Sequence, residues 1–276
     1  MEDGRVLMEQ MSWTEIEEAI AGGMTTVLLG VGAIEQHGPH LPTGTDTYLG
    51  YALTEGVARE LGDALVAPVM RPGLSEHHTD FPGTLTLSQE TFVRVLMEYC
   101  QSLGRHGFQD IVLISSHGGN SDTMLAALPR IAKALKDTCR VHMVVPNIRD
   151  VPSEASEVYR DYGVSRPQAG VHSGFGETSM MLAVHPDLVD MDRAEEGRAD
   201  EQFYHPDYIK LSQIESFVYG VRQQSPNGIL GDARGSNAEA GRRLLEIKVR
   251  ETAEEVRRMV EVAREKAGTG QGLRQG

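Results

Sequence analysis

The stretch Asp110-Ile-Val-Leu-Ile-Ser115, followed at once by Ser116-His-Gly-Gly-Asn120, decides the fold. Its first part is a continuous apolar run, which is typical of a strand in a sheet that is covered on both faces. The second part leads into a helical pattern over about residues 121–136, and a further strand is expected at 140–145. This order of strand, loop and helix predicts a mostly parallel sheet flanked by helices, an α/β fold.

The same alternation continues on both sides of this stretch. Capping-box patterns at Ser12–Glu15 and Ser236–Glu239 predict two helix starts. Residues 186–226 are polar and mixed, and no element is assigned there. Apolar periodicity predicts strands at 25–29 and 64–67, a loop at 68–83, and helices at 13–21, 48–61, 88–106, 154–162, 179–185 and 236–266.

Composition limits the class of protein. The chain has 276 residues, 40% of them hydrophobic, and a net charge of -14. Such acidity argues against binding to nucleic acid or to anionic membranes, both of which require positive surface. The acidic N-terminus does not resemble a signal peptide, and no apolar run approaches a membrane span, so we expect a cytoplasmic protein. Cys100 and Cys139 are expected in the core, without a disulfide.

The loop after the strand at 25–29 carries residues that bind metals. It presents Glu35, His37, His40 and Asp46 among glycines and prolines that cannot continue a strand or a helix. Residues two apart in an extended segment point to one side, so Glu35 and His37 can converge on one point. Carboxylates and imidazoles on a shaped loop predict a metal site, although Asp46 could also cap the next helix.

Further ligand candidates lie elsewhere in the chain. His117 follows a buried strand, and ligands bind beyond the carboxyl ends of strands in such sheets, so we expect it in the same site. Glu177 is a further candidate, but alone it could simply favour a helix N-terminus. His172 could be a structural, hydrogen-bonding residue. His40, His77 and His78 could be ligands, supporting residues or substrate contacts, whereas His106, His142, His185 and His205 are expected to be structural or exposed.

Three other chemistries fit the sequence less well. Gly30-Val-Gly32 follows a strand as in dinucleotide-binding proteins, but Glu35 stands in place of the third glycine and prolines follow. In Gly170-Val-His-Ser-Gly174 the serine lies one place away from its position in a nucleophile elbow. There is no Walker glycine-lysine loop in the sequence.

Taken together, these motifs resemble the creatininase (creatinine amidohydrolase) family. The resemblance spans roughly residues 13–250, and its branch carries His-Gly-Gly-Asn after the central strand. The motifs that carry it are Glu35-Gln-His-Gly-Pro-His-Leu-Pro with Asp46, Phe81-Pro-Gly-Thr84, Ser116-His-Gly-Gly-Asn120, His172 with Glu177-Thr-Ser179, and Gly228-Ile-Leu-Gly-Asp232.

The resemblance implies a three-layer α/β/α fold with two divalent metals per chain, in proteins that often form hexamers built from dimers. We therefore expect one such domain over 1–267, a disordered tail over 268–276, and a homo-oligomer. Carried over residue by residue, Glu35, Asp46 and His117 would hold one metal. His37, Asp46 and Glu177 would hold the other, with His172 as the nearby acid/base group.

The implied chemistry is hydrolysis by a metal-bound hydroxide. Three carboxylates and one bridging hydroxide would neutralise two divalent ions, and a metal-bound water ionises near neutral pH. Nitrogen and oxygen ligands favour Zn²⁺ or Mn²⁺, and Fe²⁺ also fits. We expect cleavage of the C–N bond of a small cyclic amide or formamide, with His172 passing a proton to the leaving group.

The sequence also departs from the family pattern. Members that hydrolyse creatinine place a carboxylate where this chain has Gly119, and they use tryptophans beside the substrate, whereas Trp13 is the single tryptophan here. Ala233 replaces a common proline. Creatinine is therefore not the expected substrate. The alternatives are opening of a keto-cyclitol ring at a C–C bond, cleavage of modified peptides, or a non-catalytic metal-binding scaffold.

Overall fold

A sheet of four parallel strands, in the order β2-β1-β3-β4, lies at the centre of the protein. The structure is a computed structural model that describes residues 4–144, 153–205 and 209–268. The described sheet confirms the predicted parallel arrangement. Its strands are β1 (Thr26–Val31), β2 (Ala64–Met70), β3 (Asp110–Ser115) and β4 (Arg140–Val144).

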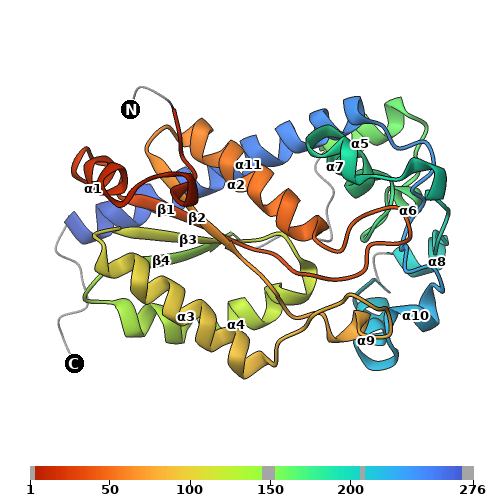
Figure 1. The fold of residues 1–276 in the computed structure, drawn as a ribbon, viewed down its shortest axis with the longest axis horizontal. Coiled ribbons are helices and arrows are strands. Elements are labelled where there is room, and N and C mark those ends of the chain that lie inside the picture. Colours follow the sequence, from red (N-terminus) through yellow and green to blue (C-terminus); the bar gives the residue numbers. More distant parts are fainter. Residues whose placement is uncertain (1–3, 145–152, 206–208, 269–276) are drawn as a thin grey trace.

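Helices cover both faces of this sheet, as Figure 1 shows. α2 (Thr45–Leu61) and the long α11 (Ala238–Gly268) lie on one face. α3 (Gln89–Arg105) and α4 (Gly118–Leu135) lie on the other, where α1 (Trp13–Ala21) joins the same apolar cluster. The predicted three-layer α/β/α fold is therefore confirmed.

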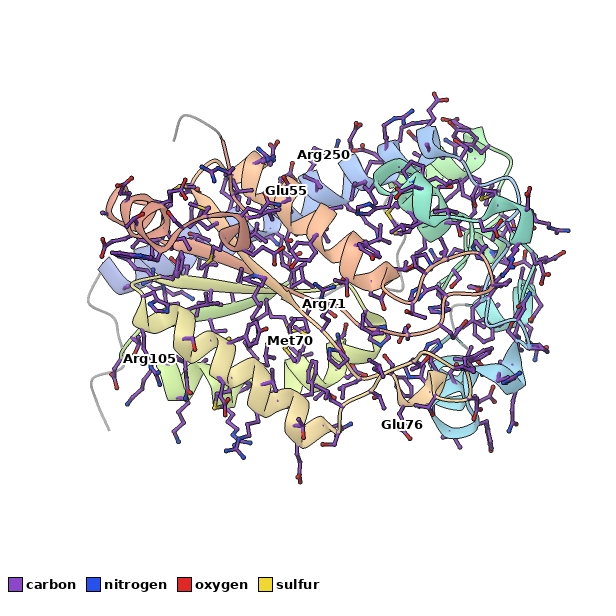
Figure 2. All side chains as sticks on the ribbon, viewed as in Figure 1. Glu55, Met70, Arg71, Glu76, Arg105 and Arg250 are labelled. Atoms are coloured by element: carbon purple, nitrogen blue, oxygen red, sulfur yellow. The ribbon has the colours of Figure 1, made fainter. Side chains whose placement is uncertain are left out.

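The strands are apolar because helices cover both faces of the sheet. All six residues of β1 are buried. Successive side chains of a strand point to opposite faces. Val27 and Leu29 accordingly pack in the cluster formed with α3 and α4, whereas Leu28 packs with α2 and α11. Arg105 and Arg250 lie on the outside of the helical layers, as Figure 2 shows.

The remaining helices gather beyond the carboxyl ends of the strands (Figure 1). Several lie in the segment 186–226, for which the sequence pattern predicted nothing, because most of them are only one turn long. None of the described helices is both long and apolar enough to cross a membrane. The helices beyond the carboxyl ends are α5 (Ser153–Asp161), α6 (Arg166–Ala169), α7 (Phe175–Val184), α8 (Glu201–Tyr204), α9 (Ile209–Tyr219), α10 (Val221–Gln224) and the 3-10 helices Glu76–His78, Pro186–Leu188 and Met191–Arg193. The 3-10 helix Met8–Gln10 instead contacts β2.

Several predicted boundaries were wrong. α2, α4 and α7 begin three or four residues earlier than expected, at Thr45, Gly118 and Phe175. The glycine-containing first turns of α4 and α7 are helical rather than loop, and α2 begins directly after Gly44, its N-cap. β2 continues past Pro68 to Met70, which is tolerated because β2 is an edge strand of the sheet. An isolated bridge pairs its outer side with Leu7 at Val66, two residues before the proline. The predicted strand end at 145 and residues 269–276 of the predicted tail (268–276) lie outside the described residues, whereas Gly268 ends α11.

The two predicted capping boxes had different outcomes. Ser12 and Glu15 form a complete capping box at the start of α1. At the start of α11, however, the Asn237 side chain accepts the hydrogen bond from the Ala240 N–H, at 3.0 Å. Ser236 instead donates its hydroxyl to the carbonyl of Ala233, so the second predicted capping box is wrong.

A buried carboxylate joins the amino end of the sheet to α11. Asp110 is 0% exposed and accepts hydrogen bonds from Arg140 at 2.6 and 2.8 Å, from His142 at 2.9 Å and from Arg264 at 3.0 Å. Burial alone would raise the pKa of Asp110, but these donors outweigh it and hold the pKa well below its usual range. His142 is therefore structural, as predicted. Cys100 and Cys139 are buried and free, also as predicted.

Candidate metal centre

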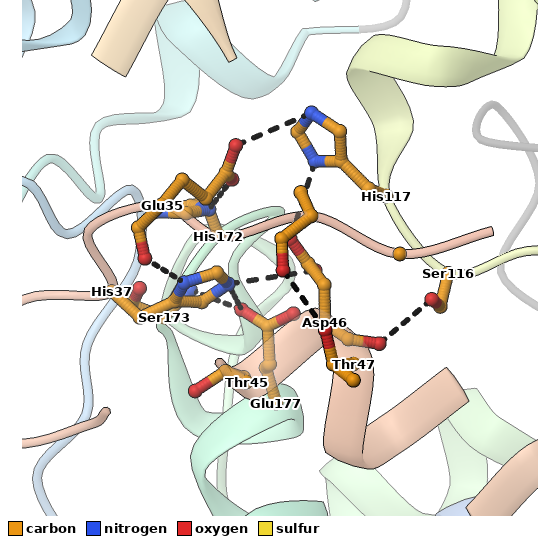
Figure 3. A network of polar contacts seen from close by, with 12 residues as sticks. Glu35, His37, Thr45, Asp46, Thr47, Ser116, His117, His172, Ser173 and Glu177 are labelled. Atoms are coloured by element: carbon orange, nitrogen blue, oxygen red, sulfur yellow. Dashed lines mark hydrogen bonds and ion pairs between the residues drawn. The ribbon is translucent and has the colours of Figure 1, made fainter. Parts of the chain in front are cut away.

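Carboxylates and imidazoles from four parts of the chain converge beyond the carboxyl ends of β1 and β3 (Figure 3). Two come from the loop after β1, one from the first turn of α2, one from the residue before α4, and two from the region where α7 begins. All six predicted site residues are among them: Glu35, His37, Asp46, His117, His172 and Glu177.

Glu35, Asp46 and His117 form one group, whose ligand atoms all lie within 4.8 Å of one another. His117 Nε2 lies 3.2 Å from Glu35 Oε2, and His117 Nδ1 lies 3.4 Å from Asp46 Oδ2. The three residues are 0%, 2% and 6% exposed, so water screens their charges poorly. Such a buried group of two carboxylates and an imidazole suits a divalent cation.

His37, Asp46 and Glu177 form a second group within the same distance limit. His37 Nε2 lies 3.6 Å from Asp46 Oδ1 and 3.6 Å from Glu177 Oε2. Asp46 therefore offers one oxygen to each group, Oδ1 towards His37 and Oδ2 towards His117. A carboxylate placed in this way can bridge two ions. Because Asp46 lies in the first turn of α2, after Gly44 as N-cap, its predicted capping role is wrong.

Several polar atoms of these groups have no hydrogen-bond partner among the described residues. They are buried and face the centre of the site: Glu35 Oε1 and Oε2, His37 Nε2 and Asp46 Oδ2. A buried charge without a partner costs several kcal/mol, so a compensating cation would stabilise such a cluster. The residues thus fit the metals that the sequence motifs imply.

Backbone carbonyls orient the two ligand histidines. His117 Nε2 donates to the Leu74 carbonyl at 2.9 Å, which leaves Nδ1 as the nitrogen that can bind a metal. His37 Nδ1 donates to the Glu35 carbonyl at 3.1 Å, which leaves Nε2 for the second group. Metal-binding histidines commonly donate their other N–H to a carbonyl, because this fixes both the tautomer and the ring plane.

The electrostatics of the site favour positive charge. Burial raises the pKa of Glu35 to about 7, with the Asp46 carboxylate adding to the effect and the His117 and His37 imidazoles opposing it. Burial opposes charge on His37 as well, but the Asp46 and Glu177 carboxylates outweigh it and raise the pKa of His37 to about 10. A divalent cation satisfies the same demand for positive charge that these protons meet.

His172 lies beside the ligands rather than in either group with Asp46. Its Nδ1 is 3.6 Å from Glu35 Oε1, and its ring centroid is 4.3 Å from that of His37. Burial, followed by the proximity of His37 and His117, lowers the pKa of His172 well below its usual range, so the ring is neutral near pH 7. A neutral imidazole at this position can accept a proton.

The sequence alone does not assign a role to His40, His77 or His78, and the structure places them differently. His40 bonds to the Thr178 hydroxyl at 2.8 Å and supports the loop from outside the ligand groups. His77 and His78 lie with Glu35 in a third group of ligand-type atoms. His78 Nε2 is 3.4 Å from Glu35 Oε1, whereas the ring of His77 packs 4.1 Å from that of Phe217.

Position 119 cannot carry a side chain in this backbone. A Cβ atom on Gly119 would overlap His117 Nε2 and would lie 2.5 Å from the Leu74 carbonyl oxygen. Glu177 provides a carboxylate within the second ligand group instead. The observed geometry agrees with the sequence difference from the members that hydrolyse creatinine.

Two residues of the site were not predicted from the sequence. Gln36 is 6% exposed and contacts both His78 and His172. Ser173 has a φ of 57°, an unusual value for a residue other than glycine, and its N–H donates to Glu177 Oε2 at 2.6 Å. Gln36 could have been suspected from the sequence, because it lies between two predicted ligands, Glu35 and His37. No sequence pattern indicates the conformation of Ser173.

Known proteins are similar to this chain in sequence and in fold. A family profile described as creatinine amidohydrolase matches residues 9–256. The chain is 28% identical to the creatinine amidohydrolase of Pseudomonas putida over 91% of this chain and 96% of that protein. It is 31% identical to the mycofactocin precursor peptide peptidase of Mycolicibacterium smegmatis over 84% of each.

Structural comparison leads to the same family. A structure described as creatininase Mn superposes with a TM-score of 0.76 and 27% identity, over 92% of this chain and 98% of that chain. The fold, the profile match and the relatives agree over nearly the whole length. The chain therefore belongs to the creatininase family and is a hydrolase of that family.

Proposed function

We propose that the protein is a two-metal hydrolase that cleaves the C–N bond of a small cyclic amide or formamide. The observation that carries this proposal is the pair of ligand groups sharing Asp46. Four of their buried atoms have no hydrogen-bond partner among the described residues: Glu35 Oε1 and Oε2, His37 Nε2 and Asp46 Oδ2. One metal would be held by Glu35, Asp46 and His117. The other would be held by His37, Asp46 and Glu177.

Zn²⁺ or Mn²⁺ fits this set of nitrogen and oxygen ligands best, and Fe²⁺ also fits. When bound, such ions would polarise the substrate carbonyl and make a water molecule acidic near neutral pH. The carboxylates of Glu35, Asp46 and Glu177 balance most of the ionic charge. The neutral ring of His172 would accept a proton and return it to the departing nitrogen.

The structure favours a substrate other than creatinine. Gly119 has no space for a carboxylate. Trp13 is 74% exposed on α1, at the opposite end of the sheet from the site, so it lies far from the ligand groups of its own chain.

A peptide is the second candidate substrate. Ile214, Phe217 and Val218 are 57%, 52% and 64% exposed and share one face of α9. Phe217 contacts His77, which lies beside Glu35. An apolar face so close to the ligands could bind the side chains of a substrate larger than a cyclic amide, and one relative is a peptide peptidase.

A substrate screen tests the proposal. Zinc and manganese forms should hydrolyse at least one lactam, formamide or short apolar peptide, and Asp46→Ala should abolish this turnover. Glu76→Ala, which removes an exposed carboxylate from the neighbouring 3-10 helix, serves as the matched control and should remain active. Turnover only of keto-cyclitols would contradict C–N cleavage, and turnover of nothing would favour the scaffold.

A further inference from the structure

The amide of Gln36 is held in one orientation. Its Oε1 accepts a hydrogen bond from the Gly38 N–H at 2.9 Å. Because a backbone N–H can only donate, the oxygen of the amide must face Gly38 and its nitrogen must face the other way. Gln36 Nε2 lies within 3.0 Å of three atoms, which are His78 Nδ1, His172 Nε2 and the carbonyl oxygen of Gly228.

The backbone of the same residue sets the tautomer of His172. His172 Nε2 lies 2.9 Å from the carbonyl oxygen of Gln36. A carbonyl only accepts, so Nε2 carries the hydrogen and donates it. In the neutral ring, Nδ1 is then unprotonated. This nitrogen lies 3.6 Å from Glu35 Oε1, on the side of the metal ligands.

The tautomer of His78 follows by elimination. The Gln36 amide has two hydrogens, and His172 Nε2 cannot accept one because it carries its own. The two remaining acceptors are the Gly228 carbonyl at 3.0 Å and His78 Nδ1 at 2.9 Å. His78 Nδ1 is therefore unprotonated, and Nε2 carries the hydrogen. Glu35 Oε1 lies 3.4 Å from this nitrogen.

We propose that Gln36 is a positioning residue that sets both tautomers, so that His78 carries its hydrogen on Nε2 while His172 presents an unprotonated Nδ1. His78 is then not a ligand of a further cation in the group of Glu35, His77 and His78, because such binding needs a lone pair on Nε2. The tautomers do not depend on the proposed reaction, whereas the use of His172 Nδ1 in proton transfer rests on it.

The loop at Gly228 is built around the same amide. Gly228 has a φ of 81°, and a Cβ atom there would overlap Gln36 Oε1. Its carbonyl takes one of the two amide hydrogens. A glycine is thus needed both for the backbone conformation and for the close approach of Gln36.

Neutron diffraction of the zinc-loaded protein after deuterium exchange tests the tautomers directly. The expected result is a deuteron on Nε2 of both His78 and His172 and none on either Nδ1. A deuteron on Nδ1 of either ring, or a zinc ion bound to His78 Nε2, would overturn the proposal. If the deuterons are as expected but no substrate is turned over, the proposed function fails and the tautomer assignment stands.

A variant tests the consequence for catalysis. Gln36→Glu keeps the size of the side chain and an acceptor for the Gly38 N–H, but a carboxylate cannot donate to His78. With both metals retained, kcat should fall about 10–100-fold with little change in KM, as for other residues that orient metal ligands. Gln89→Glu makes the same chemical change at an exposed position and should behave as wild type. Equal kcat in the two variants would overturn the positioning role.

Discussion

A methyl group added at Gly119 should weaken metal binding, although Gly119 is not a ligand. In Gly119→Ala the new Cβ atom would overlap His117 Nε2 and would lie 2.5 Å from the Leu74 carbonyl oxygen. These two atoms form the 2.9 Å hydrogen bond that orients His117. The imidazole must therefore rotate or the first turn of α4 must shift.

The size of the effect can be worked out from these contacts. Overpacking of this kind costs about 1–3 kcal/mol, and loss of the hydrogen bond costs about 1 kcal/mol. Together they predict a loss of roughly 2–4 kcal/mol in the free energy of unfolding of the metal-depleted protein. Because His117 also loses its orientation, metal affinity should fall about 10–100-fold.

Competition with a chelator measures this affinity, and thermal unfolding measures the stability. Gly118→Ala is the matched control, since a Cβ atom there meets nothing within 4 Å. That variant should bind metal as wild type does and should be neutral or more stable by up to about 1 kcal/mol. If Gly119→Ala also bound metal with wild-type affinity, the carbonyl of Leu74 would not be what orients His117.

Asp110→Asn should destabilise the protein by about 2–4 kcal/mol at pH 7 in chemical denaturation, because Arg140 then faces an amide. Since folding depresses the pKa of Asp110, the contribution of its carboxylate is present above its unfolded pKa of about 3.9 and is lost as pH falls towards the folded value. The two unfolding curves should converge in acid, and a gap that widens there would contradict this linkage. Gly228→Ala should lower the melting temperature and kcat by displacing Gln36; an unchanged melting temperature would show that the loop adapts. His172→Ala should retain both metals but lose about 10²–10⁴-fold in turnover; unchanged turnover would remove its proton-transfer role.

The layers of the fold could be predicted because β1 and β3 are apolar on both faces. Strands of this type require covering on each side, and the helical patterns between them supply the covering. Pro68 and the glycines that open α4 were misread, since a local signal cannot show that a strand lies at a sheet edge or that a glycine belongs to a helical turn.

The ligands were predictable for a different reason. Glu35, His37 and His117 lie in the loops that follow β1 and β3, and the carboxyl ends of neighbouring parallel strands meet at one edge of the sheet. Glu177 and His172, by contrast, depend on the family resemblance, because nothing local shows that α7 begins beside the same edge.

The hydrogen bonds that orient the ligands could not be predicted. Leu74 orients His117 through its backbone carbonyl, and every residue type has this group, so the sequence does not indicate the role of Leu74. The side chain of Gln36 donates a hydrogen bond to the carbonyl of Gly228, which lies 192 positions later in the sequence. Such pairings arise only once the loops are folded against each other, and their sequence signal is limited to the glycines that make room for them.

Metal stoichiometry tests the central claim most directly. Elemental analysis of the protein purified with Zn²⁺ or Mn²⁺ should find two ions per chain, because two ligand groups converge on Asp46. Asp46→Ala should lose both ions while remaining folded. A wild-type chain that binds no metal, or an Asp46→Ala variant that keeps both ions, would contradict the shared two-metal centre.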